Sequence, residues 1–276
     1  MRTRLRNTVV VLVATLLAAA AALTAAAPAN AVVGGTVLPP GQAPYLVSIG
    51  RPTHVCGGTV IGATWILTSA HCVAGAAPTE LRVRAGTLIH ASGGVLVGVA
   101  EVVPHGSYNA STIDYDLALL RLTKALPLGA GIATVPLAAN GNDPSTGTAR
   151  VSGWGATTSD GPLVAAARVV PVPLISRAKC RTEYGATVIT DRMLCAGEDA
   201  GGKDACRGDS GGPLVLSGVL VGISSWGRGC GQAGYAGVYT RVGALRSWID
   251  AERAGTRLAA SRPAPAGGAP APGTAR

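Results

Sequence analysis

Short apolar runs, many of them rich in valine, alternate along most of this chain with breaks of Gly, Pro, Asn, Asp and Ser. Runs of about four to eight residues punctuated in this way are typical of β-strands joined by turns. The regular succession of such runs favours an all-β sandwich or barrel. The predicted strands cover residues 45–49, 61–68, 81–85, 95–103, 117–122, 150–152, 168–175, 213–216, 219–225 and 237–242.

A helical pattern is clear only after the last predicted strand. Leu245, Trp248 and Ile249 fall on one face of a helix, and Gly255 follows as a stop signal. The two halves of the strand-rich region carry similar numbers of predicted strands. Two barrels therefore fit the pattern, although the pattern does not require them.

Both ends of the chain lack this strand pattern. Residues 1–31 combine a basic amino terminus, an apolar run of about 15 residues and a series of small residues, which predicts a secretory signal peptide. The run is shorter than the roughly 20 residues of a membrane-spanning helix, which disfavours an uncleaved anchor. Residues 255–276 contain almost only small residues, Pro and Arg, and are expected to form a disordered tail. Residues 32–254 remain as the expected folded unit.

The formal net charge of +9 suggests nucleic acid as a partner, but the distribution of the charge argues against it. The signal peptide and the tail each hold three arginines and no acid, so the folded unit has a net charge of only +3. It contains no basic run, and we therefore exclude nucleic-acid binding.

An even number of cysteines behind a signal peptide predicts disulfides formed in an oxidising compartment. Six cysteines allow 15 different pairings, so spacing alone does not assign them. No C-x-x-C pair occurs, which gives a zinc or redox site little support. The cysteines are Cys56, Cys72, Cys180, Cys195, Cys206 and Cys230.

A serine between glycines is the strongest chemical signal of the chain. The segment Gly208-Asp209-Ser210-Gly211-Gly212 would let backbone N–H groups approach a reacting carbonyl closely. A serine hydroxyl needs a general base to become a nucleophile. The segment therefore predicts acyl transfer and directs the search to a histidine and an aspartate elsewhere.

The order of the candidate partners excludes two catalytic plans. The four histidines all precede Ser210: His54, His71, His90 and His105. An α/β-hydrolase needs its histidine after the serine, and a subtilisin needs an aspartate before its histidine. The first aspartate, Asp114, follows every histidine. Only the order His, Asp, Ser remains.

His71 is the best candidate for the base, because it ends an apolar run, predicted as a strand, and precedes Cys72, so rigid structure would hold it on both sides. The other three histidines lie among turn residues and are expected to be ordinary exposed side chains. Asp116 directly precedes an apolar run and could orient the imidazole. Asp114 lies two residues earlier, and spacing alone does not separate the two acids.

Seven short motifs span the folded unit in a fixed order. Each is weak alone, but the whole series resembles the trypsin-like serine proteases of the chymotrypsin family, and among them the secreted bacterial trypsins. The motifs are Val32-Val33-Gly34-Gly35, Thr68-Ser69-Ala70-His71-Cys72, Asp116-Leu117-Ala118-Leu119-Leu120, Gly153-Trp154-Gly155, Gly208-Asp209-Ser210-Gly211-Gly212-Pro213, Ser225-Trp226-Gly227 and Gly237-Val238-Tyr239-Thr240.

The resemblance implies an all-β fold of two six-stranded antiparallel Greek-key barrels with a C-terminal helix and an active site between the barrels. It assigns His71 as base, Asp116 as the acid that orients it, and Ser210 as nucleophile. Asp116 is selected over Asp114 because the family's aspartate directly precedes the Leu-Ala-Leu-type strand. The backbone N–H groups of Gly208 and Ser210 would form the oxyanion hole.

The resemblance also implies a specificity pocket with Asp204 at its base. A carboxylate in a narrow, largely apolar slot has an unmet electrostatic demand that an Arg or Lys side chain meets. Ala205 replaces a serine common in trypsins, which predicts Arg over Lys. The other implied substrate-binding residues are Ser225, Trp226, Gly227 and Gly237. The implied disulfides are Cys56–Cys72, Cys180–Cys195 and Cys206–Cys230.

Val32 and Asp209 are implied as an activation pair, in which the freed α-amino group of Val32 pairs with the acid before the nucleophile. Signal cleavage after Ala31 would release Val32 directly, whereas cleavage after Ala27 would leave residues 28–31 as a short propeptide. We favour the propeptide, because an immediately active protease endangers its own export.

The expected protein is thus a secreted, extracellular and monomeric endopeptidase that cleaves protein or peptide substrates after Arg or Lys. Protein protease inhibitors are further candidate partners, and no membrane contact is expected after signal cleavage. The alternative is an inert protease-like binding protein, but such relatives usually lack a triad or oxyanion residue, and all are present here. No cofactor or metal is expected, because Arg177 and Arg241 stand where some bacterial trypsins carry acids for calcium.

Overall fold

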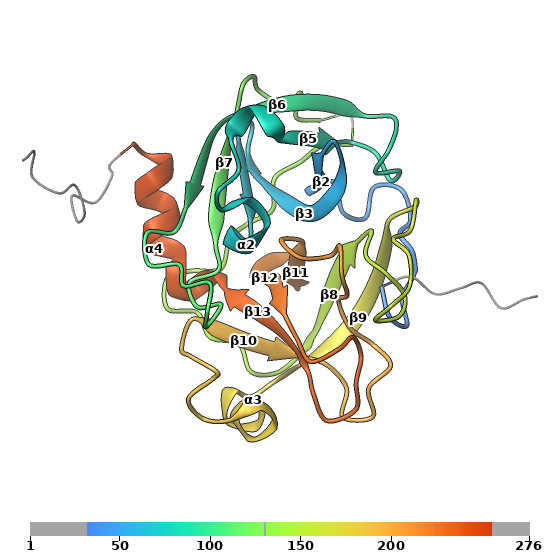
Figure 1. The fold of residues 1–276 in the computed structure, drawn as a ribbon, viewed down its shortest axis with the longest axis vertical. Coiled ribbons are helices and arrows are strands. Elements are labelled where there is room, and N and C mark those ends of the chain that lie inside the picture. Colours follow the sequence, from blue (N-terminus) through green and yellow to red (C-terminus); the bar gives the residue numbers. More distant parts are fainter. Residues whose placement is uncertain (1–31, 130, 256–276) are drawn as a thin grey trace, which may run out of the picture. The chain divides into compact units, whose positions relative to one another are not determined.

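The computed structural model describes residues 32–129 and 131–255, so the expected signal peptide, propeptide and nearly all of the expected tail lie outside the described residues. The described strands form two antiparallel barrels of six strands each (Figure 1). The two-barrel prediction is thereby confirmed. None of the described helices is long and apolar enough to cross a membrane.

The N-terminal barrel closes in the order β2-β3-β4-β7-β6-β5, with β5 paired to β2. Its inner face carries the alternate apolar residues of each strand, which pack into one cluster in the barrel. Its strands are β2 (Leu46–Arg51), β3 (Thr53–Gly62), β4 (Trp65–Thr68), β5 (Arg82–Ala85), β6 (Val95–Pro104) and β7 (Ala118–Leu122).

The C-terminal barrel follows the order β9-β10-β13-β12-β11-β8 and closes through the pairing of β8 with β9. The short strand β1 (Thr36–Val37) adds to the outside of β9. The six strands are β8 (Thr148–Gly153), β9 (Arg168–Ile175), β10 (Met193–Ala196), β11 (Pro213–Leu216), β12 (Val219–Trp226) and β13 (Gly237–Arg241).

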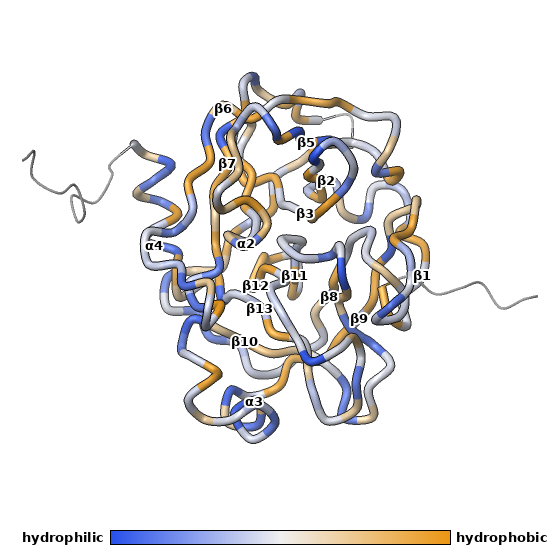
Figure 2. The backbone as a smooth tube through the Cα atoms, viewed as in Figure 1, coloured by the Kyte–Doolittle hydropathy of each residue, from blue (hydrophilic) through white to orange (hydrophobic). Residues whose placement is uncertain are grey.

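The hydropathy pattern explains why these segments pair. In β9, Val170, Val172 and Leu174 are buried at every second position, as expected for a strand with one face on the core. Figure 2 shows apolar residues along the strands of both barrels and polar residues on many of the loops. The final helix, α4 (Val242–Arg253), buries Leu245 and Ile249 as predicted.

Sequence reasoning misplaced one strand and missed five short elements, namely β1, β10 and three short helices. The predicted strand 61–68 is the end of β3 followed by a turn and β4, and β3 begins at Thr53. The first part of β3 was not predicted because it contains Gly57, and glycine has low strand propensity. The glycine is needed because a Cβ at Gly57 would lie 2.9 Å from the Cα of Gly212.

The missed elements include β10 and the helix α3 (Arg177–Tyr184). This helix buries only Cys180, so it has no apolar stripe for a periodicity argument to find. Its start is set by Ser176, whose side chain accepts a hydrogen bond from the backbone N–H of Lys179. Two further short helices are α2 (Ala70–Val73) and the 3₁₀ turn η1 (Pro78–Glu80).

Candidate active site

His71 lies on a short helix, and the expectation that it ends a strand is wrong. The strand β4 stops at Thr68, and α2 then carries the histidine. Ser69, at the start of α2, is fully buried, and its hydroxyl donates a 2.7 Å hydrogen bond to the carbonyl of Ser224 in β12. This hydrogen bond therefore connects the short helix that carries His71 to the C-terminal barrel.

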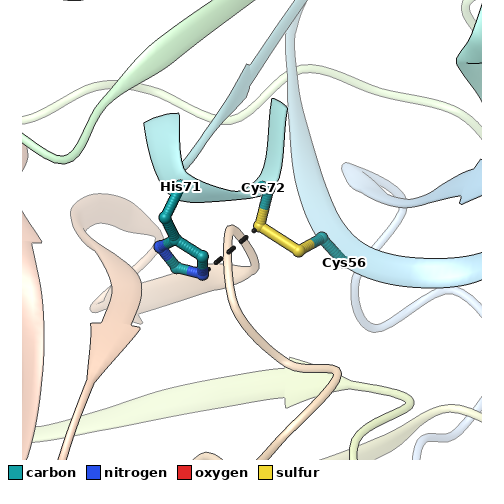
Figure 3. A group of neighbouring side chains, drawn as sticks. All are labelled: Cys56, His71 and Cys72. Atoms are coloured by element: carbon teal, nitrogen blue, oxygen red, sulfur yellow. Dashed lines mark hydrogen bonds between the residues drawn. A yellow bond between two sulfur atoms is a disulfide. The ribbon is translucent and has the colours of Figure 1, made fainter. Parts of the chain in front are cut away.

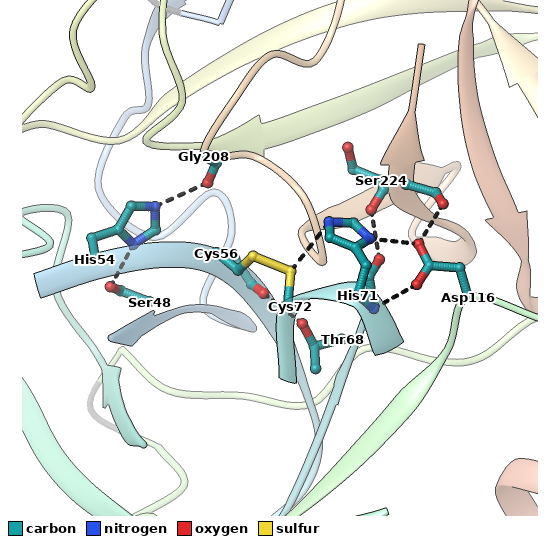
Figure 4. Close-up of a disulfide and its surroundings, with 12 residues drawn as sticks. Ser48, His54, Cys56, Thr68, His71, Cys72, Asp116, Gly208 and Ser224 are labelled. Carbon is teal, nitrogen blue, oxygen red and sulfur yellow. Dashed lines mark hydrogen bonds and ion pairs between the residues drawn. A yellow bond between two sulfur atoms is a disulfide. The ribbon is translucent and has the colours of Figure 1, made fainter. Parts of the chain in front are cut away.

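Two hydrogen bonds join His71 to Asp116 (Figure 4). The backbone N–H of His71 donates to Oδ1 at 2.8 Å, and Nδ1 lies 2.7 Å from Oδ2. Because an ionised carboxylate only accepts hydrogen bonds, Nδ1 carries the proton. The neutral imidazole then presents a lone pair at Nε2, which is the form that a general base requires.

The carboxylate of Asp116 belongs to the N-terminal barrel but is held by the C-terminal one. The Ser225 hydroxyl, on β12, donates to Oδ2, and the Thr240 hydroxyl, on β13, donates to the backbone carbonyl of Asp116 at 2.7 Å. The aspartate itself is only 1% exposed. These bonds fix the distance and orientation of the acid relative to His71.

Asp114 is engaged elsewhere, which separates it from Asp116. Its carboxylate accepts hydrogen bonds from the guanidinium of Arg192 and the hydroxyl of Thr190. Burial raises the pKa of Asp114, but these bonds, with that from the N–H of Tyr115, outweigh it and bring the pKa below its usual value. Among the described residues, no hydrogen bond joins Asp114 to His71.

Ser210 lies at the wall of a cavity in the C-terminal barrel and is half-buried. Its backbone carbonyl accepts a 2.8 Å hydrogen bond from the N–H of Gly57 in the N-terminal barrel. Among the described residues, no hydrogen bond joins the hydroxyl of Ser210 to His71. The Nε2 atom of His71 lies 3.6 Å from Sγ of Cys72 (Figure 3). Catalytic hydrogen bonds often tighten only when substrate binds, so this geometry is compatible with a base and its nucleophile.

Gly208, one of the two predicted oxyanion-hole residues, occupies a position that requires glycine. Its φ of +95° suits glycine, and a Cβ there would lie 2.5 Å from Leu163. The described hydrogen bonds do not use the N–H groups of Gly208 or Ser210, which leaves both available to a ligand. The carbonyl of Gly208 accepts a 2.9 Å hydrogen bond from Nε2 of His54.

His54 is the residue that sequence reasoning missed most clearly. It is 6% exposed, and its ring bridges the hydroxyl of Ser48 at 2.7 Å and the carbonyl of Gly208 (Figure 4). A carbonyl cannot donate, so Nε2 carries the proton and Nδ1 accepts from Ser48. Burial lowers the pKa of His54 to about 4, so the ring is neutral at neutral pH.

The other two histidines are not exposed side chains either. His90 is half-buried with its ring 5.2 Å from that of His54, and His105 stacks at 4.7 Å on Tyr115. The expectation of three ordinary exposed histidines is therefore wrong. Residues from distant parts of the chain cover them, which the local turn composition does not reveal.

The cavity beside Ser210 has a volume of about 170 Å³ and contains Asp204 in its lining. Asp204 is 4% exposed; its Oδ2 accepts a hydrogen bond from the N–H of Gly231, whereas Oδ1 is buried without a partner. Burial raises the pKa of this carboxyl to about 7. A Cβ at Gly237 would lie 2.3 Å from Oδ1, so only glycine leaves the carboxylate open to the cavity.

The remaining substrate-binding candidates line the same cavity. Ala205, Ser225, Trp226 and Gly227 all border it, so the structure brings together residues from the two chain segments 204–210 and 224–239. The acid, with one unpartnered oxygen, faces largely uncharged walls, so a cationic or hydrogen-bond-donating ligand group would match this pocket.

Asp209, the candidate activation acid, is fully buried without a described basic partner. Its two carboxylate oxygens accept hydrogen bonds from the N–H groups of Gly155, at 2.7 Å, and Cys206, at 3.0 Å. Burial raises its pKa to about 7. Val32 is also fully buried, and its φ of +48° is one that a β-branched residue rarely adopts.

The six cysteines form the three disulfides that the family resemblance implies: Cys56–Cys72, Cys180–Cys195 and Cys206–Cys230. Among the described residues, one group of potential metal ligands is close enough to share an ion, namely Cys56, His71 and Cys72 (Figure 3). Its sulfurs are joined in a disulfide and are not thiolates, so the group does not fit a metal site.

Sequence comparison gives the family of the chain. The profile of the Trypsin family matches residues 32–249. The chain belongs to the trypsin family. Trypsin Blo t 3 of Blomia tropicalis is 44% identical over 79% of this chain and 84% of its own length. Trypsin 5G1 of Aedes aegypti is 42% identical (80% and 84%), and the vitellin-degrading protease of Bombyx mori is 41% identical (82% and 87%).

Membership of the trypsin family identifies the chain as a serine endopeptidase. The inert binding protein is accordingly not favoured. The relatives come from a mite and insects, and a human serine protease matches as well, so the comparisons give no support to the bacterial subtype of the sequence resemblance.

Proposed function

We propose that this trypsin-family enzyme hydrolyses peptide bonds after Arg and Lys, with Arg preferred. The observation that carries the proposal is Asp204, a nearly fully buried carboxylate with one unpartnered oxygen in the cavity beside Ser210. A guanidinium offers five N–H donors in a planar fork, which matches that oxygen in both charge and hydrogen bonding. An uncharged side chain would leave the carboxylate unpaired in a dry pocket.

In the proposed mechanism, the Oγ of Ser210 attacks the scissile carbonyl carbon while its proton passes to Nε2 of His71. The new C–O bond yields a tetrahedral oxyanion, and Asp116 stabilises the imidazolium without accepting its proton. Collapse breaks the C–N bond, and Nε2 returns the proton to the leaving amine. Water then repeats the sequence on the acyl-enzyme and frees Ser210.

The oxyanion would be bound by the N–H groups of Gly208 and Ser210. Such donors are typically worth about 3–4 kcal/mol of the barrier each. The 2.8 Å hydrogen bond from the N–H of Ala156 to the carbonyl of Arg207 supports this assignment, because holding that carbonyl on one side of the Arg207–Gly208 peptide plane turns the N–H of Gly208 to the other. His54 holds the carbonyl of the next peptide, on the other side of the Gly208 Cα, and would act as a positioning residue for this loop.

Activation would occur when the bond before Val32 is cut and the new α-amino group pairs with Asp209. Two observations support this: Asp209 has no described basic partner, and the φ torsion of Val32 is unfavourable only while a peptide bond precedes it. An α-amino group has a pKa of about 8, so activity should decline as the pH rises above that value. Amino-terminal sequencing of the active protein should begin at Val32.

Secretion, a monomeric state and binding of protein protease inhibitors are part of the same proposal. The signal-peptide pattern of residues 1–31 and the three disulfides support an oxidising, extracellular location. Detection of the processed protein in the culture medium would test its secretion.

The deciding experiment is hydrolysis of matched peptide amides ending in Arg, Lys or Phe by the secreted protein. We expect the order Arg, then Lys, with Phe far behind, and loss of activity by several orders of magnitude in Ser210→Ala. Ser107→Ala, which changes an exposed serine outside the site, should keep full activity. Equal rates on all three substrates, or an active Ser210→Ala variant, would overturn the proposal.

A further inference from the structure

A second cavity lies outside the catalytic cleft, on the N-terminal barrel, and has a volume of about 230 Å³. We name it the arginine cavity. Its polar wall comes from the outer face of two paired strands, where Ser48 of β2 lies opposite Arg84 of β5, and Gly50 opposite Arg82. The residues that line it are Ser48, Gly50, Pro52, Thr53, His54, Arg82, Arg84, His90, Ala91 and Leu96.

The charges of the arginine cavity are unbalanced. One nitrogen of Arg82 donates to the carbonyls of Thr79 and Leu81, and one of Arg84 donates to the carbonyl of Gly93. Neither guanidinium forms an ion pair with any described acid, and no acid lines the cavity. Their remaining N–H groups can therefore serve an anionic ligand.

The other wall is apolar. Leu96 is 52% exposed and lies directly opposite Arg84 across the β5–β6 pair, with Pro52 and Ala91 also at the rim. An exposed leucine beside two unpaired cations suits a ligand with an anionic end and an apolar body. A small hydrated anion such as phosphate would leave this wall unused.

The arginine cavity is connected to the active site by one side chain. His54 lines the cavity, and the same ring donates the hydrogen bond that holds the carbonyl of Gly208. An anion beside the imidazole of His54 favours positive charge on the ring, which strengthens the hydrogen bond that Nε2–H donates. Occupation of the cavity would therefore act on the peptide that follows Gly208, which lies between the two predicted oxyanion-hole donors.

We propose that the arginine cavity binds a carboxylate carried on an apolar body, and that its occupant stabilises the Gly208 loop through His54. The carboxylate oxygens face Arg82 and Arg84, and the apolar body rests on Leu96. The binding step does not depend on the proposed peptide specificity. A carboxylate is also repelled by Asp204, so it is a probe that separates this cavity from the specificity pocket.

The test is a titration of the secreted Ser210→Ala protein with benzoate, at constant ionic strength of about 0.1 M set with chloride, followed through the ring resonances of His54 and His90. We expect saturable shifts in both. The double variant Arg82→Gln/Arg84→Gln should raise the dissociation constant at least about tenfold. Arg121→Gln, which changes an exposed strand arginine of the same barrel that is already paired with Glu101, should change it less than about twofold.

Two further arms keep the proposal falsifiable if the double variant folds poorly. Leu96→Asp places an acid at the rim of the cavity without replacing an arginine, and should abolish benzoate binding. In active enzyme, benzoate should raise kcat on the Arg amide, and His54→Gln should remove that rise. The proposal is overturned by shifts that do not saturate, by equal affinity in the arginine variant, by phosphate binding more tightly than benzoate, or by an unchanged kcat at saturation.

Discussion

Replacing Asp204 by asparagine should change the enzyme in two separable ways, one visible in its stability and one in its substrate preference. The stability effect follows from the burial of the carboxylate. Burial raises the pKa of Asp204 from 3.8 to about 7, so the folded protein holds a proton that the unfolded chain releases between those values. The carboxylate therefore costs stability as the pH rises from about 4 to 7, and the whole cost is present above 7.

A shift of about three pKa units corresponds to roughly 4 kcal/mol. Asp204→Asn keeps the size of the side chain but cannot ionise, so it should be more stable than the parent above pH 7, by up to that amount. In a domain of this size, such a gain would raise Tm by about 8 °C or more. Below pH 4 the two proteins should have similar stability, because both then carry a neutral side chain at this position.

The substrate effect has the opposite sign. Without the carboxylate, a substrate guanidinium would enter the pocket unpaired, which costs about 3–5 kcal/mol. The value of kcat/KM on the Arg amide should fall by roughly a hundredfold to several thousandfold, while that on the Phe amide changes little. Melting curves from pH 3 to 9 in a Ser210→Ala background, together with kinetics of the active proteins, measure both. A variant that keeps its Arg preference, or parallel pH–stability curves for the two proteins, would refute the reasoning.

Three further predictions concern single side chains. Burial lowers the pKa of His54 from 6.5 to about 4, so the parent should lose stability, by up to about 3 kcal/mol, as the pH falls from 6.5 to 4. The unfolding free energy of His54→Gln should depend less on pH in this range. Ala205→Ser should raise cleavage after Lys relative to Arg, and an unchanged ratio on matched amides would contradict the specificity argument. Arg192→Gln should lower the unfolding free energy by about 1–2 kcal/mol, more than Arg121→Gln does, because Asp114 is largely buried and Glu101 is not.

The amino-acid sequence by itself determined the class of fold and the class of chemistry. Valine-rich runs of strand length, with turn residues between them, allow few structures other than sheets, and the burial pattern of β9 follows its sequence residue by residue. The order of histidines, aspartates and the serine left one triad plan. The inferences about fold and enzyme class succeeded because they depend on local periodicity or on short motifs in chain order, whereas the triad stays a prediction.

Spacing left Asp114 and Asp116 open and the family resemblance favoured Asp116, but only the tertiary structure shows what physically separates the two acids. Asp114 and Asp116 are two residues apart and chemically alike, yet Arg192 and Thr190 engage the first, whereas the second bonds His71. All of these partners lie at least 45 positions away along the chain.

The same holds for His54, whose local sequence suggests an exposed turn but whose ring holds a carbonyl 154 positions further on. Contacts of such sequence separation arise when two barrels pack together, and neither composition nor spacing encodes them. Local patterns thus predicted the strands and the reacting groups, while long-range packing decided burial, protonation and the partner of each side chain.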